Sequence, residues 1–305
     1  MKKNAKDAKN IKSKKKERGL KSATTKKERE MNFASTKEIE KKVSEKTKVV
    51  KEKKEIKSVE AIKSSEFDIP LVELLEAGCH FGHQSRRWNP KMKPFIYCSR
   101  DGVHIFDLAQ TAKRLQDACL AAREFVSKGG VILFLGTKRQ AAVIVKKEAI
   151  RAGAPYVTVR WLGGTISNWQ EIKKRLDKLA DMKEKKEKGE YDKYTKKENV
   201  LIDREISRLE RFFGGMSDLN KTPDALFIVD INKEMTAVRE ARRLGIKIFA
   251  IADSNSDPDL IDYPIPANDD AVKSIELVVK TFGKAVGEGM ELRKKTKDNR
   301  IDNRI

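Results

Sequence analysis

The stretch VILFLGTKRQAAVIVKKEAIRA, residues 131–152, decides the fold. Its first five residues form an uninterrupted apolar run, which is typical of a strand buried on both faces of a parallel sheet. Thr137 is expected to cap a helix that continues to about Ala152, and the Gly-Ala-Pro at residues 153–155 is expected to end it. A buried strand followed directly by a helix is the unit from which parallel sheets are built.

The same alternation continues along the chain, where short apolar runs predict strands and periodic segments predict helices. Strands that alternate with helices favour a parallel sheet covered on both faces. The predicted fold class is therefore α/β, a doubly wound, three-layer α/β/α domain. The expected strands are Tyr156–Val159, Ala225–Val229, Ile246–Ala250 and Ile265–Pro266, and the expected helices are Leu108–Val126 after a cap at Asp107, Lys233–Leu244, and a long C-terminal helix capped by Asn268, Asp269 and Asp270.

Two parts of the chain depart from this alternation. A short helix is expected after residues 68–70, followed by strands at Pro94–Cys98 and Val103–Phe106 around a turn at residues 100–102. Two long helical patterns with narrow apolar seams and charged outer faces then fill the region around residues 166–213. They predict an inserted antiparallel helical hairpin, whose second helix begins with a capping box formed by Thr195 and Glu198.

The charge of the chain is unevenly distributed. The 305 residues contain 67 Lys and Arg and 46 Asp and Glu, a net charge of +21, and residues 1–64 alone hold 23 basic and 10 acidic residues, a net charge of +13. Such an excess indicates a polyanionic partner, with nucleic acid ahead of an anionic membrane surface. Residues 1–64 contain one aromatic residue, Phe33, and too few apolar ones for a core, so a basic, Lys-rich, disordered N-terminal extension is expected. A solvating tail without a fixed partner is the alternative.

Several classes of protein are disfavoured by composition. No window approaches the ~18 apolar residues of a membrane span, and the N-terminus lacks the apolar segment of a secretory signal. The three cysteines, Cys79, Cys98 and Cys119, form no CxxC pair, so a disulfide framework is not expected and a reducing cytosol is the default. Only three histidines are present, which leaves little material for His-based catalysis.

The candidate ligand sites are weak. One candidate is the segment that joins a strand to a helix at Leu135-Gly136-Thr137-Lys138. It lacks the glycines and the spacing of a nucleotide-binding loop, so a plain turn is favoured. Lys138 and Arg139 could still meet an external phosphate there. Cys79, His80 and His83 could bind a metal only with a partner from elsewhere, and the aspartates of residues 253–262 do not match a calcium loop. Neither a metal nor a cofactor is predicted.

The strongest chemical signal lies in residues 85–93, SRRWNPKMK, where cations alternate with an aromatic residue. Arginine forms forked contacts to phosphate, and tryptophan stacks on splayed bases, so this composition suits structured RNA. A second candidate, residues 160–168, begins with Arg160 and Trp161 where a strand ends. Arg/Trp pairs also brace loops, which is the alternative for both stretches.

Together these motifs resemble the bacterial small-subunit ribosomal protein S2 family, from about Ile69 to Gly289. The matching runs are LLEAGCHFGHQSRRWNPKM (Leu74–Met92), GVHIFDL (Gly102–Leu108), FLGTK (Phe134–Lys138), YVTVRWLGGTISN (Tyr156–Asn168), FGGM (Phe213–Met216), PDALFIVD (Pro223–Asp230) and DPDLIDYPIPANDD (Asp257–Asp270).

The resemblance implies a flavodoxin-like α/β/α domain over residues 65–292, with the helical hairpin inserted in it. Residues 1–64 and a C-terminal tail, 293–305, lie outside the family pattern. The family is not enzymatic: its members are structural constituents of the small subunit, act in its assembly and in translation, bind its rRNA, and help dock ribosomal protein S1. The expected location is the ribosome of the cytoplasm, with no membrane and no small-molecule substrate as partner. RNA contact is expected at Arg86, Arg87, Trp88, Asn89, Lys91, Lys93, Arg100, Lys138, Arg139, Arg160 and Trp161.

Two other functions stay open at the level of sequence. A doubly wound sheet also hosts nucleotide-dependent enzymes, although no phosphate-binding fingerprint is present. A general nucleic-acid binder acting through residues 1–64 is the third hypothesis, and deletion of that segment would separate it from a ribosomal role.

Overall fold

The computed structural model describes residues 67–302, with side chains up to residue 295, so the extension predicted at residues 1–64 lies outside the described residues. The described residues form one compact unit.

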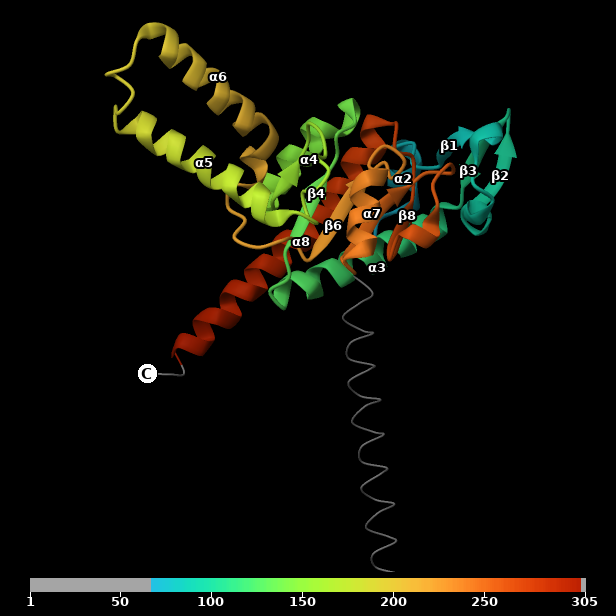
Figure 1. Cartoon of the computed structure of the whole chain (residues 1–305). Coiled ribbons are helices and arrows are strands. Elements are labelled where there is room, and N and C mark those ends of the chain that lie inside the picture. The colour runs from blue at the N-terminus through green and yellow to red at the C-terminus, as the bar shows by residue number, and fades with distance from the viewer. Residues whose placement is uncertain (1–66, 303–305) are drawn as a thin grey trace, which may run out of the picture. The chain divides into compact units, whose positions relative to one another are not determined.

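A five-stranded parallel sheet forms the centre of this unit (Figure 1). Its strand order is β5-β4-β6-β7-β8, which corresponds to the order 2-1-3-4-5 of flavodoxin-like sheets. The predicted α/β class is confirmed, although β5 is shorter than expected. The strands are β4 (Ile132–Leu135), β5 (Tyr156–Val157), β6 (Ala225–Val229), β7 (Lys247–Ala252) and β8 (Tyr263–Pro266).

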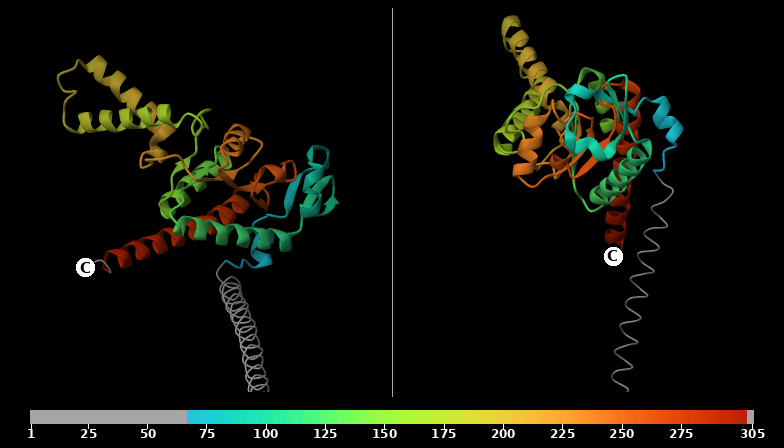
Figure 2. Two further views of the ribbon diagram at one scale, coloured as in Figure 1. Left: turned by 60° about the horizontal axis from the view of Figure 1, so that its bottom comes forward. Right: turned by 90° about the vertical axis from the view of Figure 1, so that its right-hand side faces the viewer.

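Helices cover both faces of the sheet, because alternate strand residues enter two separate cores. In β4, Ile132 and Phe134 pack into one core, whereas Leu133 and Leu135 pack into the other. Helices α3, α4 and α8 cover the first face, and α7 and the base of the hairpin cover the second (Figure 2). The three-layer prediction is therefore confirmed. The bounds are α3 (Leu108–Ser127), α4 (Arg139–Ala152), α7 (Met235–Arg243) and α8 (Val272–Asp302).

A small antiparallel sheet of order β1-β3-β2 lies beyond one edge of the domain (Figure 1). Its strands are β1 (Phe81–Gln84), β2 (Ile96–Arg100) and β3 (Val103–Phe106), and a short helix, α2 (Leu71–Glu76), precedes it. The sequence predicted β2, β3 and α2 but missed β1. Strand β2 begins at Ile96 rather than Pro94, because Pro94 lies in the 3-10 helix η2 (Pro90–Phe95).

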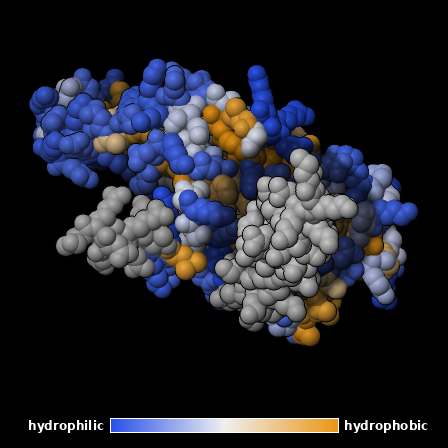
Figure 3. Space-filling view, turned by 90° about the horizontal axis from the view of Figure 1, so that it is seen from below, coloured by the Kyte–Doolittle hydropathy of each residue, from blue (hydrophilic) through white to orange (hydrophobic). Residues whose placement is uncertain are grey.

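The inserted hairpin consists of α5 (Trp169–Glu187) and α6 (Lys196–Phe213), joined by a short connection. Apolar residues of the two helices are buried between them, and Thr195 and Glu198 form the predicted capping box. Three ion pairs join the helices across the seam, and the face seen in Figure 3 is largely hydrophilic here. The pairs are Lys178–Glu205 (3.2 Å), Lys183–Glu210 (2.7 Å) and Lys186–Asp203 (2.7 Å).

Several predicted helix ends differ from the structure; α7, for example, begins at Met235 rather than Lys233. Lys138, not Thr137, occupies the N-cap position of α4, because the Thr137 hydroxyl donates a hydrogen bond to the buried Glu234 carboxylate instead. Helix α8 continues through Asp302, so the segment expected as a tail from residue 293 is helical over most of its length. None of the described helices is long and apolar enough to cross a bilayer.

Candidate nucleic-acid interface

The basic loop, residues 85–93, leaves the small sheet directly after β1. It begins with the 3-10 helix η1 (Ser85–Arg87), in which Arg86 and Arg87 are exposed and form no ion pair with the described residues. The Ser85 N–H donates to the Gly102 carbonyl at 2.8 Å, which holds η1 against the turn that follows Arg100. The side chain of Arg100 is 82% exposed. Three arginines are thus presented from one corner of the small sheet.

Trp88 and Asn89 link the basic loop to the domain. The Trp88 ring is half-buried and lies 5.0 Å from the His104 ring, at an interplanar angle of 43°. The Asn89 N–H donates to the Ser254 carbonyl at 2.7 Å, and its side chain accepts from the Lys91 N–H at 3.0 Å, which caps η2. Asn89 therefore fixes the course of the loop, and Trp88 combines a packed face with partial exposure.

Lys91 and Lys93 differ in the charges around them. The Lys91 ammonium lies 2.9 Å from Asp257 and 2.7 Å from Asp259. Hydrogen bonds that the Lys91 ammonium donates to Asp259 and Asp257 raise the pKa of Lys91. Burial by itself raises the pKa of Asp257, but the hydrogen bonds from Lys91 and from the Asp259 N–H outweigh it and lower that pKa. Lys93 is exposed and has no such partner in the described chain. Of these two predicted RNA contacts, only Lys93 offers an uncompensated charge.

The segment that follows β7, residues 253–257, packs against the basic loop and holds it in place. The His83 N–H donates to the Ser254 hydroxyl at 2.8 Å, so this segment contacts β1 at His83 and the basic loop at Asn89 and Lys91. Asp253 and Ser254 are buried, with 1% and 0% of their surface exposed. Neither residue was predicted from the sequence as a support for the loop, although both lie in a polar run directly after a buried strand.

A cluster of charged residues lies at the carboxyl ends of the parallel strands, the usual place for a ligand on such a sheet. The Lys138 ammonium lies 3.2 Å from Asp230, 2.8 Å from Asp269 and 2.6 Å from Asp270. Burial by itself lowers the pKa of Lys138, but hydrogen bonds to Asp269 and Asp270 outweigh it and raise that pKa above its usual value. The side chain is 14% exposed, so Lys138 holds strand ends together and is not presented to an external phosphate.

The turn before Lys138 has a packing role as well. A Cβ atom at Gly136 would approach the Val145 side chain to 2.7 Å, so the glycine allows α4 to pack closely on the strand end. This supports the plain turn favoured by sequence over a nucleotide-binding loop. Arg139, the first residue of α4, is exposed and forms no ion pair with a described residue.

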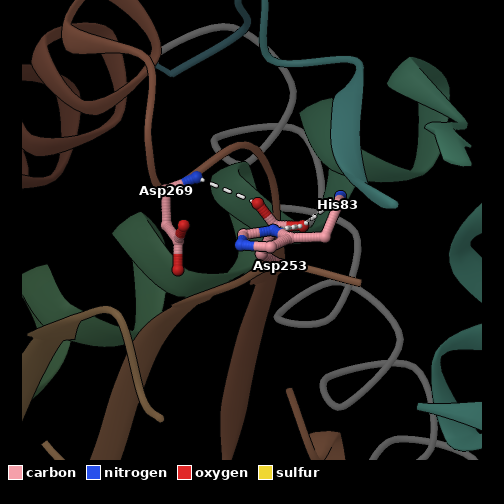
Figure 4. Close-up of side chains that lie close together, drawn as sticks. All are labelled: His83, Asp253 and Asp269. Atoms are coloured by element: carbon pink, nitrogen blue, oxygen red, sulfur yellow. Dashed lines mark hydrogen bonds and ion pairs between the residues drawn. The ribbon is translucent and has the colours of Figure 1, made fainter. Parts of the chain in front are cut away.

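His83, Asp253 and Asp269 form the one group among residues 67–295 whose ligand atoms suit a metal ion (Figure 4). One atom from each lies within 4.8 Å of the others, and the His83 Nδ1 is 3.0 Å from Asp253. Imidazole and carboxylate ligands fit Zn²⁺. The group takes His83 from one weak candidate of the sequence and Asp253 from the aspartates of the other, whereas Asp269 was in neither and Cys79 and His80 are not part of it.

The aspartates that suggested a cation loop mostly have local roles. Asp257 accepts a hydrogen bond from the Asp259 N–H at 3.1 Å and caps the 3-10 helix η4 (Pro258–Leu260). Asp262 accepts from the Ile248 N–H at 2.8 Å. These are the helix caps and turns that the sequence favoured for this segment.

The group formed by His83, Asp253 and Asp269 predicts that the stability of the fold depends on pH. Burial, with Asp253 and Asp230, raises the pKa of Asp269 to about 7, and the hydrogen bond with Asp253 raises the pKa of His83. Both groups bind a proton more tightly in the folded chain, so the free energy of unfolding should fall as pH rises from about 5.5 to 8, by about 1–3 kcal/mol. Urea unfolding in buffer with a chelator measures this. In the Asp269→Asn variant the free energy of unfolding should fall less over this pH range than in the wild-type chain. An equal fall in the two proteins would show that Asp269 does not cause the pH dependence.

Residues 160–168 brace the fold. Trp161 is 6% exposed and packs in the core below the hairpin, and its indole N–H donates to Glu240 at 3.4 Å. The Gly164 N–H donates to the same carboxylate at 2.7 Å. Trp161 is therefore not presented for base stacking, and the bracing alternative describes it. Arg160 is exposed. Glu240, the anchor of this loop, lies in α7 and was not identified from the sequence.

Comparisons with known proteins give one consistent result. The family model described as ribosomal protein S2 matches residues 74–289. The chain is 48% identical over 225 residues to small ribosomal subunit protein uS2 of Nocardia farcinica, covering 74% of this chain and 79% of that protein. It is 49% identical over 221 residues to uS2c of Rhodomonas salina, covering 72% and 91%. It is 47% identical over 221 residues to uS2 of Microcystis aeruginosa, covering 72% and 83%.

Proposed function

Because this chain belongs to the ribosomal protein S2 family and is a protein of the small ribosomal subunit, we propose that it binds small-subunit rRNA through the basic loop. As a structural ribosomal protein it is not an enzyme, which sets aside the nucleotide-dependent alternative. We propose the ribosome of the cytoplasm as the location of the chain and neighbouring ribosomal proteins among its partners. The contacts proposed for RNA are Arg86, Arg87, Trp88, Lys93 and Arg100, with Arg139 and Arg160 as outlying cations.

One observation carries this proposal: Arg86, Arg87 and Arg100 are exposed at one corner of the small sheet, without an acidic partner other than Asp101 in the described chain. Asp101 is a weak one, since its carboxylate is 3.8 Å from the Arg100 guanidinium and both side chains are more than 80% exposed. Arginine binds phosphate with two parallel hydrogen bonds, and a partly exposed indole can stack on an unpaired base. Lys91, Lys138 and Trp161 support the loop and the fold instead.

Binding to small-subunit rRNA as a function of salt tests the proposal. Phosphate contacts release counterions, so affinity should fall by at least about tenfold between 50 and 200 mM salt. A large-subunit rRNA fragment of similar length serves as the competitor, and it should bind more weakly. Equal affinity for both RNAs would favour a general nucleic-acid binder.

We also propose that the chain helps to dock ribosomal protein S1, as the family resemblance implies. Small subunits isolated from cells depleted of this chain should then hold less S1, and re-addition of the purified chain should restore it. S1 levels that do not change on depletion would contradict the proposal.

Residues 1–64 are proposed to add largely sequence-independent contacts to rRNA, because they carry a net charge of +13. A chain that lacks these residues should bind small-subunit rRNA more weakly, and the slope of log affinity against log salt should become less steep. Nitrocellulose filter binding of both proteins over a salt series measures the difference. Assembly of the truncated chain with an unchanged salt dependence would exclude this role.

The hairpin tip, residues 183–197, is proposed as a second contact with RNA or protein. Tyr191 and Tyr194 meet edge to face with ring centroids 5.9 Å apart, and the Lys193 ammonium lies 5.8 Å from the Tyr194 ring. Aromatic and cationic groups thus lie together at the tip. The alternative is a self-sufficient two-helix unit that projects into solvent, and protection of Tyr194 from chemical modification in assembled subunits would distinguish the two.

A further inference from the structure

Helix α4 presents a second surface, on the side of the helix away from the sheet. Ala141, Val145 and Ala149 of α4 are buried, whereas Val143 and Ile150 point outward and are 75% and 58% exposed. These two positions are seven residues apart, so they lie on one side of the helix, about 10 Å from each other. Branched aliphatic residues do not favour exposed helix positions for reasons of helix propensity. The exposure of Val143 and Ile150 indicates that another molecule covers this surface.

The charges on this surface all have one sign. Lys146 and Lys147 lie between Val143 and Ile150 on the exposed side, and neither forms an ion pair with a described residue. The single acid of α4, Glu148, is buried and pairs with Arg151 at 2.7 Å. The α4 outer face, defined by Val143, Lys146, Lys147 and Ile150, is therefore an apolar stripe with basic residues and no exposed acid.

Two hollows adjoin the α4 outer face at the base of the hairpin. Lys146 lines one of about 320 Å³ together with Glu210, whose carboxylate pairs with Lys183, and Ile150 lines another of about 440 Å³, whose walls include Ala154, Pro155, Asp218 and Leu219. Tyr156 lines both. Side chains of a partner that lies on α4 could enter these hollows, which is how anchor residues bind at protein interfaces.

An RNA backbone fits this surface poorly. Phosphates would pair with Lys146 and Lys147 but would leave Val143 and Ile150 in contact with water. A protein partner buries an apolar centre inside a charged rim. Apolar positions seven residues apart match the repeat of a second amphipathic helix lying alongside, and the two lysines require acidic residues on its flanks.

We propose that the α4 outer face docks an acidic amphipathic helix of a neighbouring protein in the small subunit. This inference rests on the proposed place of the chain in that subunit and is independent of the basic loop, which lies on the small sheet. The occupant has apolar residues one heptad apart that cover Val143 and Ile150, and carboxylates that pair with Lys146 and Lys147.

The first test uses cells in which this chain is the only S2 protein. The full-length Val143→Glu/Ile150→Glu variant should enter small subunits at least about tenfold less than the wild-type chain, because it places two carboxylates at the apolar centre. Leu244→Glu is the matched control, since Leu244 is 49% exposed and lies beyond the end of α7. It should enter at the wild-type level. Circular dichroism of the purified chains shows whether each variant is folded.

The second test identifies the occupant. A photoreactive amino acid replaces Lys147 at the rim, and purified small subunits that contain this chain are irradiated. The expected product is an adduct, resistant to ribonuclease, with an acidic helical segment of another protein, and Lys146→Glu in the same chain should lower its yield about tenfold. The same photoreactive amino acid at Leu244 is the control for the adduct yield. The proposal would be overturned by an adduct with rRNA, or by an adduct yield from position 147 no higher than that from position 244. Entry of the double glutamate variant into small subunits at the wild-type level would also overturn it. Absence of the wild-type chain itself from small subunits would instead overturn the proposed function.

Discussion

Replacing Arg86 and Arg87 with alanine is expected to weaken binding to small-subunit rRNA by about 30- to 100-fold, or about 2–3 kcal/mol. A hydrogen bond to a charged group contributes about 1.5–3 kcal/mol, and solvent reduces this contribution at an exposed site. Both guanidinium groups are exposed on η1 and pair with no described residue, so folding should be unchanged. The slope of log affinity against log salt should also become less steep. Filter binding over a salt series gives both quantities.

The chain contains a matched control for this variant. Arg242 and Arg243 are adjacent and exposed in the last turn of α7, away from the small sheet. Arg242→Ala/Arg243→Ala removes the same charge from the chain, so it separates a local contact from the effect of net charge. Similar losses of affinity in the two double variants would mean that the basic loop is not a specific contact.

Replacing Lys138 with alanine is expected to lower the free energy of unfolding by about 3–5 kcal/mol, which is typical when one partner of a buried ion pair is removed. Asp269 is 1% exposed, and Asp230 is 13% exposed, so their carboxylates would lose their cation in a poorly hydrated place. Affinity of the folded variant for rRNA should stay close to that of the wild-type chain. Urea unfolding and filter binding measure the two effects separately.

Lys147→Ala is the control, because Lys147 lies in α4, the helix that Lys138 caps, but is exposed and forms no ion pair with a described residue. This substitution should change the free energy of unfolding by no more than about 0.5 kcal/mol. Adding Asp269→Asn to Lys138→Ala should recover part of the lost stability, since it removes one of the unpaired carboxylates. Unchanged stability together with a loss of RNA affinity would show that Lys138 is a phosphate contact, as the sequence first indicated.

The parallel sheet could be predicted from sequence because its strands are buried on both faces. Continuous apolar runs such as Ile132–Leu135 and Ala225–Val229 have few other interpretations, and each is followed by a helical pattern. The hairpin was equally clear, because a narrow apolar seam on two long charged helices can be buried only by pairing them. Strand β1 was missed because it has four residues, three of them glycine or polar, and no continuous apolar run.

The site was predicted in part. Local composition identified the cations of residues 85–93, but it did not show which of them are compensated, because the partners of Lys91 and Lys138 lie more than 90 residues away. Trp161 has the same chemistry as Trp88, yet one is buried over Glu240 and the other is half-exposed over His104. That difference depends on tertiary packing, which a single motif does not contain.

Ultraviolet crosslinking of intact small subunits that contain this chain, followed by mass spectrometry of peptides that carry nucleotides, tests the central claim most directly. Peptides that include Arg86, Arg87 and Trp88 are predicted to carry small-subunit rRNA nucleotides, whereas the peptide that includes Trp161 should carry none. Adducts confined to other segments, with the peptide of residues 85–93 unmodified, would contradict the claim that this corner of the small sheet contacts the RNA.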